Sequence, residues 1–272
     1  MTLLVGLGAL AAGLLGALTG LGGGIVIVPL LTLLFHVDIR YAIGASLVSV
    51  IATSSGAAAA YVREGYTNIR VGMLLEVATT TGALLGAFIA GYVSTGAIAV
   101  IFGLLLLYSA WRSTRPLEEH VDSEPDIWSR RLRLASTYPT PTGKRAYTVH
   151  NVPFGFVMMI GAGIISGLLG IGSGAVKVLA MDRAMRLPFK VSTTTSNFMI
   201  GVTAAASAGV YLHRGYIEPG LALPVMLGVL TGALLGARVL AAAPTRRLRT
   251  LFNIVLLVMA LQMLYKGLTG GI

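Results

Sequence analysis

The sequence predicts an all-α integral membrane protein made of two related repeats. Three observations predict it: a strongly apolar composition, motifs that recur at a fixed offset of 150 residues, and basic residues gathered in short loops. Of the 272 residues, 56% are hydrophobic and only 11% are charged, whereas soluble domains carry roughly 25% charged residues. Such a chain cannot cover a globule with polar surface, so a lipid bilayer is the solvent that fits it.

The composition also excludes several kinds of site. No cysteine is present, which excludes disulfides and thiol chemistry. The four histidines stand apart, so neither a metal site nor a cofactor is predicted. The apolar segments hold no nucleophile–base pair, and we expect no enzyme. The net charge of +10 comes without a basic stripe interleaved with aromatic residues, so nucleic acid is not an expected partner.

The internal repeat rests on three matches in one register. A glycine cluster, a Tyr/Gly/Tyr set and the heptapeptide TGALLGA each occur twice, 150 residues apart and without a gap. The pairs are Gly20–Gly24 with Gly170–Gly174, Tyr61/Gly65/Tyr66 with Tyr211/Gly215/Tyr216, and Thr81–Ala87 with Thr231–Ala237. We therefore predict a duplication, with a first membrane repeat at 1–111, a polar linker at 112–150 and a second membrane repeat at 151–272.

Each half contains four apolar segments. They are expected at 2–35, 41–61, 70–92 and 96–111 in the first half, and at 152–181, 191–212, 219–241 and 250–267 in the second. A membrane crossing needs about 20 residues, so the second, third and fourth segments can each cross once. The first segment is longer and is interrupted by the glycine cluster. It is either one broken crossing or a re-entrant hairpin.

The distribution of basic residues favours the re-entrant arrangement. We place the 112–150 linker in the cytoplasm because it holds seven Lys/Arg. If both glycine segments cross, eleven basic residues fall inside and seven outside; if both are re-entrant, fifteen fall inside and Arg40, Arg214 and Lys266 outside. Both counts leave out Lys177 and Arg238, which lie within apolar segments. Re-entrant segments leave an odd number of crossings in each half, so the repeats would have inverted topology. Inverted repeats are typical of transporters that bind substrate at the midplane.

The two glycine clusters are the first candidates for a binding site. They interrupt apolar segments where an intact helix is otherwise expected, and backbone groups freed in hydrocarbon need partners. Amides beside a helix N-terminus can face an anion, although glycines also serve close packing or a sharp turn. The candidate residues are Gly22, Gly23, Gly24, Gly172, Ser173 and Gly174.

Two ionisable residues lie within apolar segments. Lys177 follows the second glycine cluster by three residues, and an intramembrane cation marks a pathway or a partner. It is a candidate for holding an anionic substrate; the alternative is a lysine that extends to the interface. Glu76 lies in the third segment and is the candidate for a coupling site, since a carboxyl removed from water binds a proton more readily. Its alternative is a carboxylate that reaches water.

Hydroxyl and amide side chains near the start of the second segment of each half complete the candidate site. They can replace the hydration shell of an oxyanion without adding charge, although hydrogen bonding between helices is the competing role. The candidates are Ser46, Thr195, Ser196 and Asn197, of which Ser46 and Ser196 are equivalent in the repeat.

These motifs carry a resemblance to a known family. The stretches GLTGLGGGIVIVP in the first half, GLLGIGSG and STTTSNFMIGVTAAAS in the second, and the paired TGALLGA resemble the TauE/SafE sulfite exporter family, also called the 4-toluene sulfonate uptake permease (TSUP) family. The resemblance covers nearly the whole chain except the linker. It implies a multi-pass permease of the cytoplasmic (inner) membrane for sulfur-containing anions, coupled to an ion gradient. Ser173 and Lys177 depart from internal symmetry, which points to the second half as the binding half.

The expected function is secondary transport of sulfite, an organosulfonate or a similar small anion by alternating access between the repeats. A passive anion channel on the same scaffold is the alternative. The expected partners are the small anionic substrate, membrane lipid and a coupling proton or Na⁺. The sequence leaves the anion, the direction of transport and the oligomeric state open, a homo-oligomer included.

Overall fold

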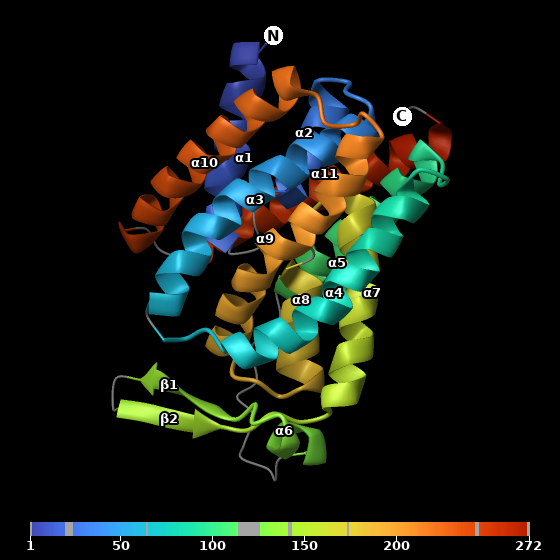
Figure 1. Ribbon diagram of the computed structural model, residues 1–272. Helices are drawn as coiled ribbons and strands as arrows, with labels where there is room; N and C mark the ends of the chain where they lie inside the picture. Colours follow the sequence, from blue (N-terminus) through green and yellow to red (C-terminus); the bar gives the residue numbers. More distant parts are fainter. Residues whose placement is uncertain are drawn as a thin grey trace.

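The computed structural model describes residues 2–19, 24–63, 65–113, 126–140, 143–172, 174–242 and 245–270. These parts of the chain are mostly helical (Figure 1). The first half holds α1 (Thr2–Thr19), α2 (Gly24–Leu34), α3 (Ile39–Arg63), α4 (Ile69–Ala90) and α5 (Thr95–Ser113). Between the halves lie α6 (Ile127–Arg131), β1 (Ser136–Thr140) and β2 (Gly143–Tyr147). The second half holds α7 (Val152–Leu169), α8 (Gly174–Leu179), the π-helix η1 (Ala180–Ala184), α9 (Phe189–His213), α10 (Pro219–Ala242) and α11 (Thr245–Thr269).

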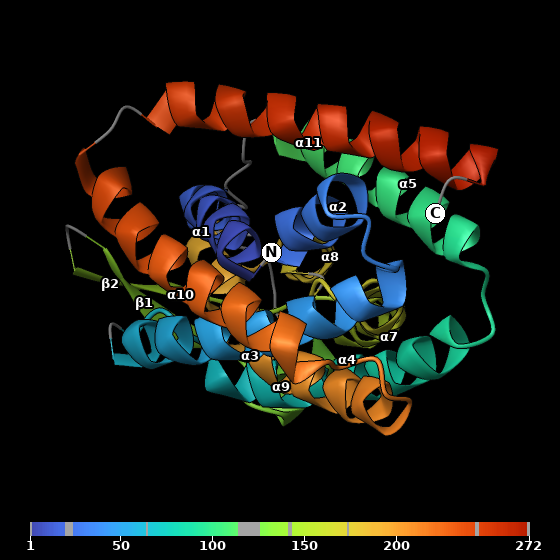
Figure 2. The same cartoon turned by 90° about the horizontal axis from the view of Figure 1, so that it is seen from above.

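The helices form a bundle with two distinct ends. Both termini lie at one end, and α6, β1 and β2 lie at the opposite end (Figure 1); we call these the terminal end and the linker end. Seen along the bundle, α5 and α11 run along one side, α3, α4, α9 and α10 along the other, and α1, α2 and α8 lie between them (Figure 2). Helix α1 starts at the terminal end, whereas α7 starts at the linker end (Figure 1).

The glycine-broken segment of each half folds back on itself. In the second half, His150 N donates to Met185 O at 3.0 Å, so the residues before α7 lie beside the end of η1. In the first half, a side chain added at Gly8 of α1 would meet Leu30 and Phe35, near the end of α2. Each segment therefore returns to the end of the bundle from which it started.

Glycines of the repeated heptapeptide TGALLGA bring helices into close contact. Gly82 of α4 lies against the Ile160 carbonyl of α7, and Gly232 of α10 lies against the Leu10 carbonyl of α1. The two contacts differ by the same 150 residues on both sides. The paired leucines that follow, Leu84 and Leu85 in the first copy, face outward. Small residues inside and leucines outside are the pattern of helices packed in lipid.

Two helices of the described chain are both long and apolar enough to cross a bilayer alone. They are Ile69–Ala90 and Val152–Leu169, with mean hydropathies of 1.6 and 2.0, while the other apolar helices or stretches run 10–17 residues, as at Ile39–Ser55 and Thr95–Trp111. We predicted single crossings for the second to fourth segments of each half. Polar residues account for part of the difference, since α9 opens with a lysine followed by a run of hydroxyl residues.

Large apolar side chains nevertheless cover the outside of the bundle. On α4, Met73 and Val77 are each 63% exposed and Phe88 is 54% exposed. Exposed apolar faces on this scale mark contact with lipid or protein rather than water. The described part of the chain is thus a helical bundle with an apolar outer surface.

The linker is more structured than the sequence suggests. We predicted a polar linker at 112–150 and named no helix or strand within it; in the structure, β1 and β2 pair there in an antiparallel hairpin. At the start of α4, Asn68 Nδ2 donates to Leu134 O at 2.9 Å and to Tyr147 Oη at 2.8 Å. The side-chain oxygen Asn68 Oδ1 accepts a hydrogen bond from Val71 N and so caps the helix. Burial raises the pKa of the Tyr147 phenol above its ordinary value, so this contact stays neutral. The hairpin is thereby fixed to the linker end of α4.

The helix contacts predict the effect of adding one methyl group to α7. In Gly163→Ala the new Cβ would fall on the Thr79 carbonyl of α4, whereas in Gly161→Ala it would meet nothing within 4 Å. We expect Gly163→Ala to lose about 1–3 kcal/mol of stability through overpacking, with a lower melting temperature in detergent. Gly161→Ala should melt at or above the parent temperature because alanine favours the helix. Equal melting of the two variants would contradict the packing described.

Candidate functional site

The bundle contains a lysine that is completely buried. Lys177 of α8 has no exposed surface, although it lies one turn beyond the second glycine cluster. Its Nζ donates a hydrogen bond to Thr203 Oγ1 of α9. The effective penalty for burying an ammonium group is several kcal/mol unless other groups compensate it. The lysine therefore does not extend to an interface, which was the alternative considered from the sequence.

A carboxylate on a third helix completes this arrangement. Thr203 Oγ1 lies 2.8 Å from Glu76 Oε1 of α4, and Thr80 Oγ1 donates to the same oxygen at 3.0 Å. Thr203 thus bridges the lysine on α8 and the glutamate on α4. The other carboxylate oxygen, Glu76 Oε2, is buried and has no hydrogen-bond partner in the described part of the chain. We call Glu76, Lys177 and Thr203 the buried charge cluster.

The second glycine cluster breaks the helix through its backbone conformation. Gly170 and Gly172 have φ angles of +66° and +70°, a left-handed conformation that side chains with a Cβ rarely adopt. Gly170 N donates to Ser166 O at 2.8 Å, which ends α7. Part of the role of these glycines is therefore structural. Of the candidates from sequence, Gly22, Gly23 and Ser173 lie outside the described residues.

The structure brings the two glycine clusters together between α3 and α9. A Cβ added at Gly24, the first residue of α2, would lie 3.3 Å from Ile171 Cα and 2.8 Å from Ser46 Oγ. Ser46 in turn donates to Gly170 O at 2.8 Å. The two clusters, offset by 150 residues in sequence, thus lie together at one buried place, where the Ser46 hydroxyl of α3 lies beside both.

The remaining candidates divide between this site and its surroundings. Ser196 Oγ donates to Gly174 O at 3.3 Å, at the start of α8. Thr195 Oγ1 instead accepts a hydrogen bond from Asn68 N at 3.0 Å, so its hydroxyl supports the start of α4 at the linker end. Asn197 is half-buried in α9. The structure therefore brings Ser46 and Ser196 to the glycine clusters and turns Thr195 toward the linker end.

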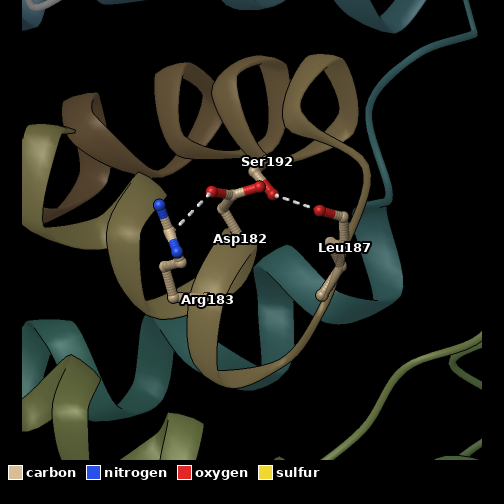
Figure 3. A network of polar contacts seen from close by, with 4 residues as sticks. All are labelled: Asp182, Arg183, Leu187 and Ser192. Atoms are coloured by element: carbon tan, nitrogen blue, oxygen red, sulfur yellow. Dashed lines mark hydrogen bonds and ion pairs between the residues drawn. The ribbon is translucent and has the colours of Figure 1, made fainter. Parts of the chain in front are cut away.

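A second buried carboxylate lies at the linker end, in the glycine-broken segment of the second half. The sequence predicted a loop from residue 182, but Asp182 lies in η1 and is only 2% exposed. Its carboxylate lies between Arg183 and Ser192 (Figure 3), with Oδ2 4.0 Å from Arg183 Nε. Ser192 Oγ donates to Leu187 O at 3.4 Å. The Ser192 bond joins the loop that follows η1 to the start of α9.

A cavity of about 340 Å³ lies away from these residues, at the start of α1, α3 and α10. Its lining includes Val5, Tyr41, Glu218 and Leu221. Within the described residues, no group of three His, Asp or Glu side chains could hold a metal ion.

Sequence reasoning missed Thr203, because it lies in a run of small residues that reads as ordinary helix packing. The available signal was its spacing: Thr203 follows Ser196 by seven residues and therefore lies on the same face of α9. The arrangement places the Lys177 cation and the Glu76 carboxylate together with the hydroxyls of Thr80 and Thr203 inside the bundle.

The chain is similar to a family of membrane proteins over nearly its whole length. The sulfite exporter TauE/SafE family matches residues 5–263. A probable membrane transporter protein of Bacillus subtilis, YunE, is 28% identical over 266 residues, covering 95% of this chain and 96% of the relative. A second B. subtilis relative, YdhB, with the same description, is 27% identical and covers 83% and 85% of the two chains. A probable membrane transporter protein of Methanocaldococcus jannaschii is 25% identical over 93% and 91%. No solved structure matches the chain significantly.

The buried charge cluster predicts a non-additive effect on stability. Lys177→Met leaves the Glu76 carboxylate buried without its cation, and breaking such a pair costs about 3–5 kcal/mol. Adding Glu76→Gln should recover most of this loss, because the double variant holds no buried charge at the cluster. Melting temperatures in detergent at neutral pH measure the effect, with Lys144→Met on exposed β2 as the control. A double variant no more stable than Lys177→Met would show that the two charges do not interact.

Proposed function

The chain belongs to the sulfite exporter TauE/SafE family and is a membrane transporter; from this premise we propose that it carries sulfite, an organosulfonate or a related small sulfur-containing anion by alternating access. The substrate would bind where the two glycine clusters meet, between α3 and α9. The observation that carries the proposal is Lys177, a fully buried cation beside one of those clusters. A buried cation with exchangeable partners is the chemistry by which a protein attracts an anion out of water.

The groups around Lys177 suit a small oxyanion. Ser46 and Ser196 are hydroxyl donors beside the glycine clusters, and each donates to a carbonyl of the second cluster. A rotation of either hydroxyl would redirect its hydrogen toward a bound oxygen atom. Thr203 would release Lys177 Nζ in the same way. The site would thus replace the hydration of an anion with one charge and several neutral donors.

The packing supports two repeats with inverted topology. The Gly82 and Gly232 contacts are equivalent under the 150-residue offset. Moreover, α1 starts at the terminal end and α7 at the linker end (Figure 1). Inverted repeats can exchange conformations, which allows a site between them to open to either side in turn. Complete burial of Lys177 fits a state that is closed to both sides.

The distribution of charge supports a cytoplasmic linker end. The described basic residues Arg70, Arg133 and Lys190 lie at this end: Arg70 bonds to the linker carbonyl of Arg133, and Lys190 lies over the Tyr66 ring. At the terminal end, Arg40 and Arg214 bond to backbone carbonyls of the turn that follows α4 and of its last residues. An excess of basic residues on one side marks the cytoplasmic face. The bundle would lie in the cytoplasmic (inner) membrane in this orientation.

The proposed substrate class can be tested with a binding and uptake screen. Sulfite, thiosulfate, sulfoacetate, taurine and sulfate are offered to the purified protein and to proteoliposomes. We expect at least one of them to bind and to be taken up, and Lys177→Ala to lose that binding while inserting normally into the membrane. Lys144→Ala, which removes an exposed lysine on β2, should behave as the parent. Lys177→Ala binding as tightly as the parent would show that Lys177 has another role.

A counterflow experiment separates transport from a passive channel on the same scaffold. Proteoliposomes loaded with the unlabelled anion should accumulate labelled anion transiently, because an alternating carrier exchanges one molecule for another. A channel equilibrates the label without overshoot. Flux that rises linearly with anion concentration and shows no overshoot would favour the channel.

A further inference from the structure

The internal partner of Lys177 is itself ionisable, and this links anion binding to a second ion. Lys177 Nζ donates to Thr203 Oγ1, and Thr203 Oγ1 lies 2.8 Å from Glu76 Oε1. An ammonium donor, a hydroxyl and a carboxylate acceptor in this order form a chain in which each hydrogen bond polarises the next. The chain fits an ionised Glu76 as the counter-ion of Lys177.

The Glu76 carboxylate is only partly satisfied. Oε1 receives hydrogen bonds from Thr80 and Thr203, but Oε2 is buried without a partner in the described part of the chain. A buried carboxylate oxygen without a donor is unfavourable when it carries charge. A proton bound there would convert the group to a neutral acid.

Few other charged groups face this carboxylate. Helix α7, which packs along α4, contains no ionisable residue, and the ionisable residues of α9 are Lys190 at its start and Tyr211 and His213 at its end. On α4 itself, Arg70 lies at the linker end and bonds to Arg133 O. On the α8–η1 segment, Asp182 and Arg183 form the separate network at the linker end. Lys177 is therefore the charge that Glu76 faces in the middle of the bundle.

We propose that Glu76, Thr203 and Lys177 form a counter-ion switch that binds one proton together with each transported anion. The inference rests on the proposed function, because it takes Lys177 as the anion site. With Glu76 ionised, the cluster is neutral, and an added anion would place two negative charges around one buried cation. With Glu76 protonated, Lys177 is left without a counter-ion, and the anion replaces the carboxylate. The anion and the proton would then cross the membrane together.

Because proton binding and anion binding are thermodynamically linked, the counter-ion switch predicts a measurable pH dependence of anion affinity. If one proton must be taken up from solution with each anion, the apparent affinity for an anion of constant charge falls about tenfold per pH unit. Thiosulfate, sulfate and methanesulfonate are suitable probes, because none changes its charge between about pH 5 and pH 8. Thr203 acts as a positioning residue that holds the two charges in contact.

The experiment measures the dissociation constants of these three anions for the purified protein across that pH range. The parent should bind at least one of them with the tenfold dependence. Glu76→Gln should bind the same anion with an affinity that does not vary with pH, since its side chain is neutral throughout. Glu218→Gln, a matched change of an exposed glutamate at the terminal end, should keep the parent dependence. Thr203→Val should weaken the pH dependence of the anion dissociation constant, whereas Thr203→Ser, which retains the hydroxyl, should keep the parent dependence.

The outcomes separate this inference from the proposed function. A parent that binds none of the three anions at any pH would overturn the proposed anion site and the switch with it. A parent that binds them, with Glu76→Gln keeping the full pH dependence, would overturn the switch alone. If Glu76→Gln does not fold, Thr203→Val is compared with Thr203→Ser instead. Equal pH dependence of anion affinity in these two variants would likewise overturn the switch. Proteoliposomes containing a pH-sensitive dye add a second measurement, in which parent anion uptake should acidify the lumen.

Discussion

The burial of one charged amine organises the centre of this protein. Lys177 has no exposed surface, and the other residues of its own helix, α8, are glycine or apolar. The groups that stabilise the charge of Lys177 therefore come from two other helices: Thr203 from α9 and Glu76 from α4. Because Glu76 precedes the linker in sequence and Lys177 follows it, this interaction joins the two halves. A rearrangement of the halves would have to break or replace it.

The glycines have two different structural roles in this bundle. Those of the heptapeptide, such as Gly82, let whole helices approach until a side chain would strike backbone, whereas Gly170 and Gly172 end a helix inside the bundle. Under the 150-residue offset, the equivalents of Lys177, Glu76 and Thr203 are Ile27, Met226 and Thr53. Ile27 is fully buried in an apolar cluster, and Thr53 bonds within its own helix. The charged residues Lys177 and Glu76 therefore have uncharged residues at the positions offset by 150.

The sequence could predict a helical membrane bundle and the intramembrane positions of Lys177 and Glu76, because periodicity, composition and the cost of buried charge are local properties. It could not predict that they meet, since 101 residues separate them and only tertiary packing decides which helix faces face each other. The alternatives considered for the two residues, extension to an interface or to water, were reasonable without that contact. Asp182 was missed for a related reason, because a π-helix extends α8 past the apolar run. The linker hairpin depends on contacts to Asn68 that no local pattern encodes.

The most direct test of the central claim is a crystal structure of the protein with selenite, the selenium analogue of sulfite, measured at the selenium absorption edge. The account predicts an anomalous selenium peak roughly 3.5–4 Å from Lys177 Nζ, the position expected when a selenite oxygen accepts a hydrogen bond of about 3 Å from that amine, beside the meeting point of the glycine clusters. The same peak should be absent from Lys177→Ala crystals. Selenium bound only elsewhere, with Lys177 still bonded to Thr203, would contradict the account.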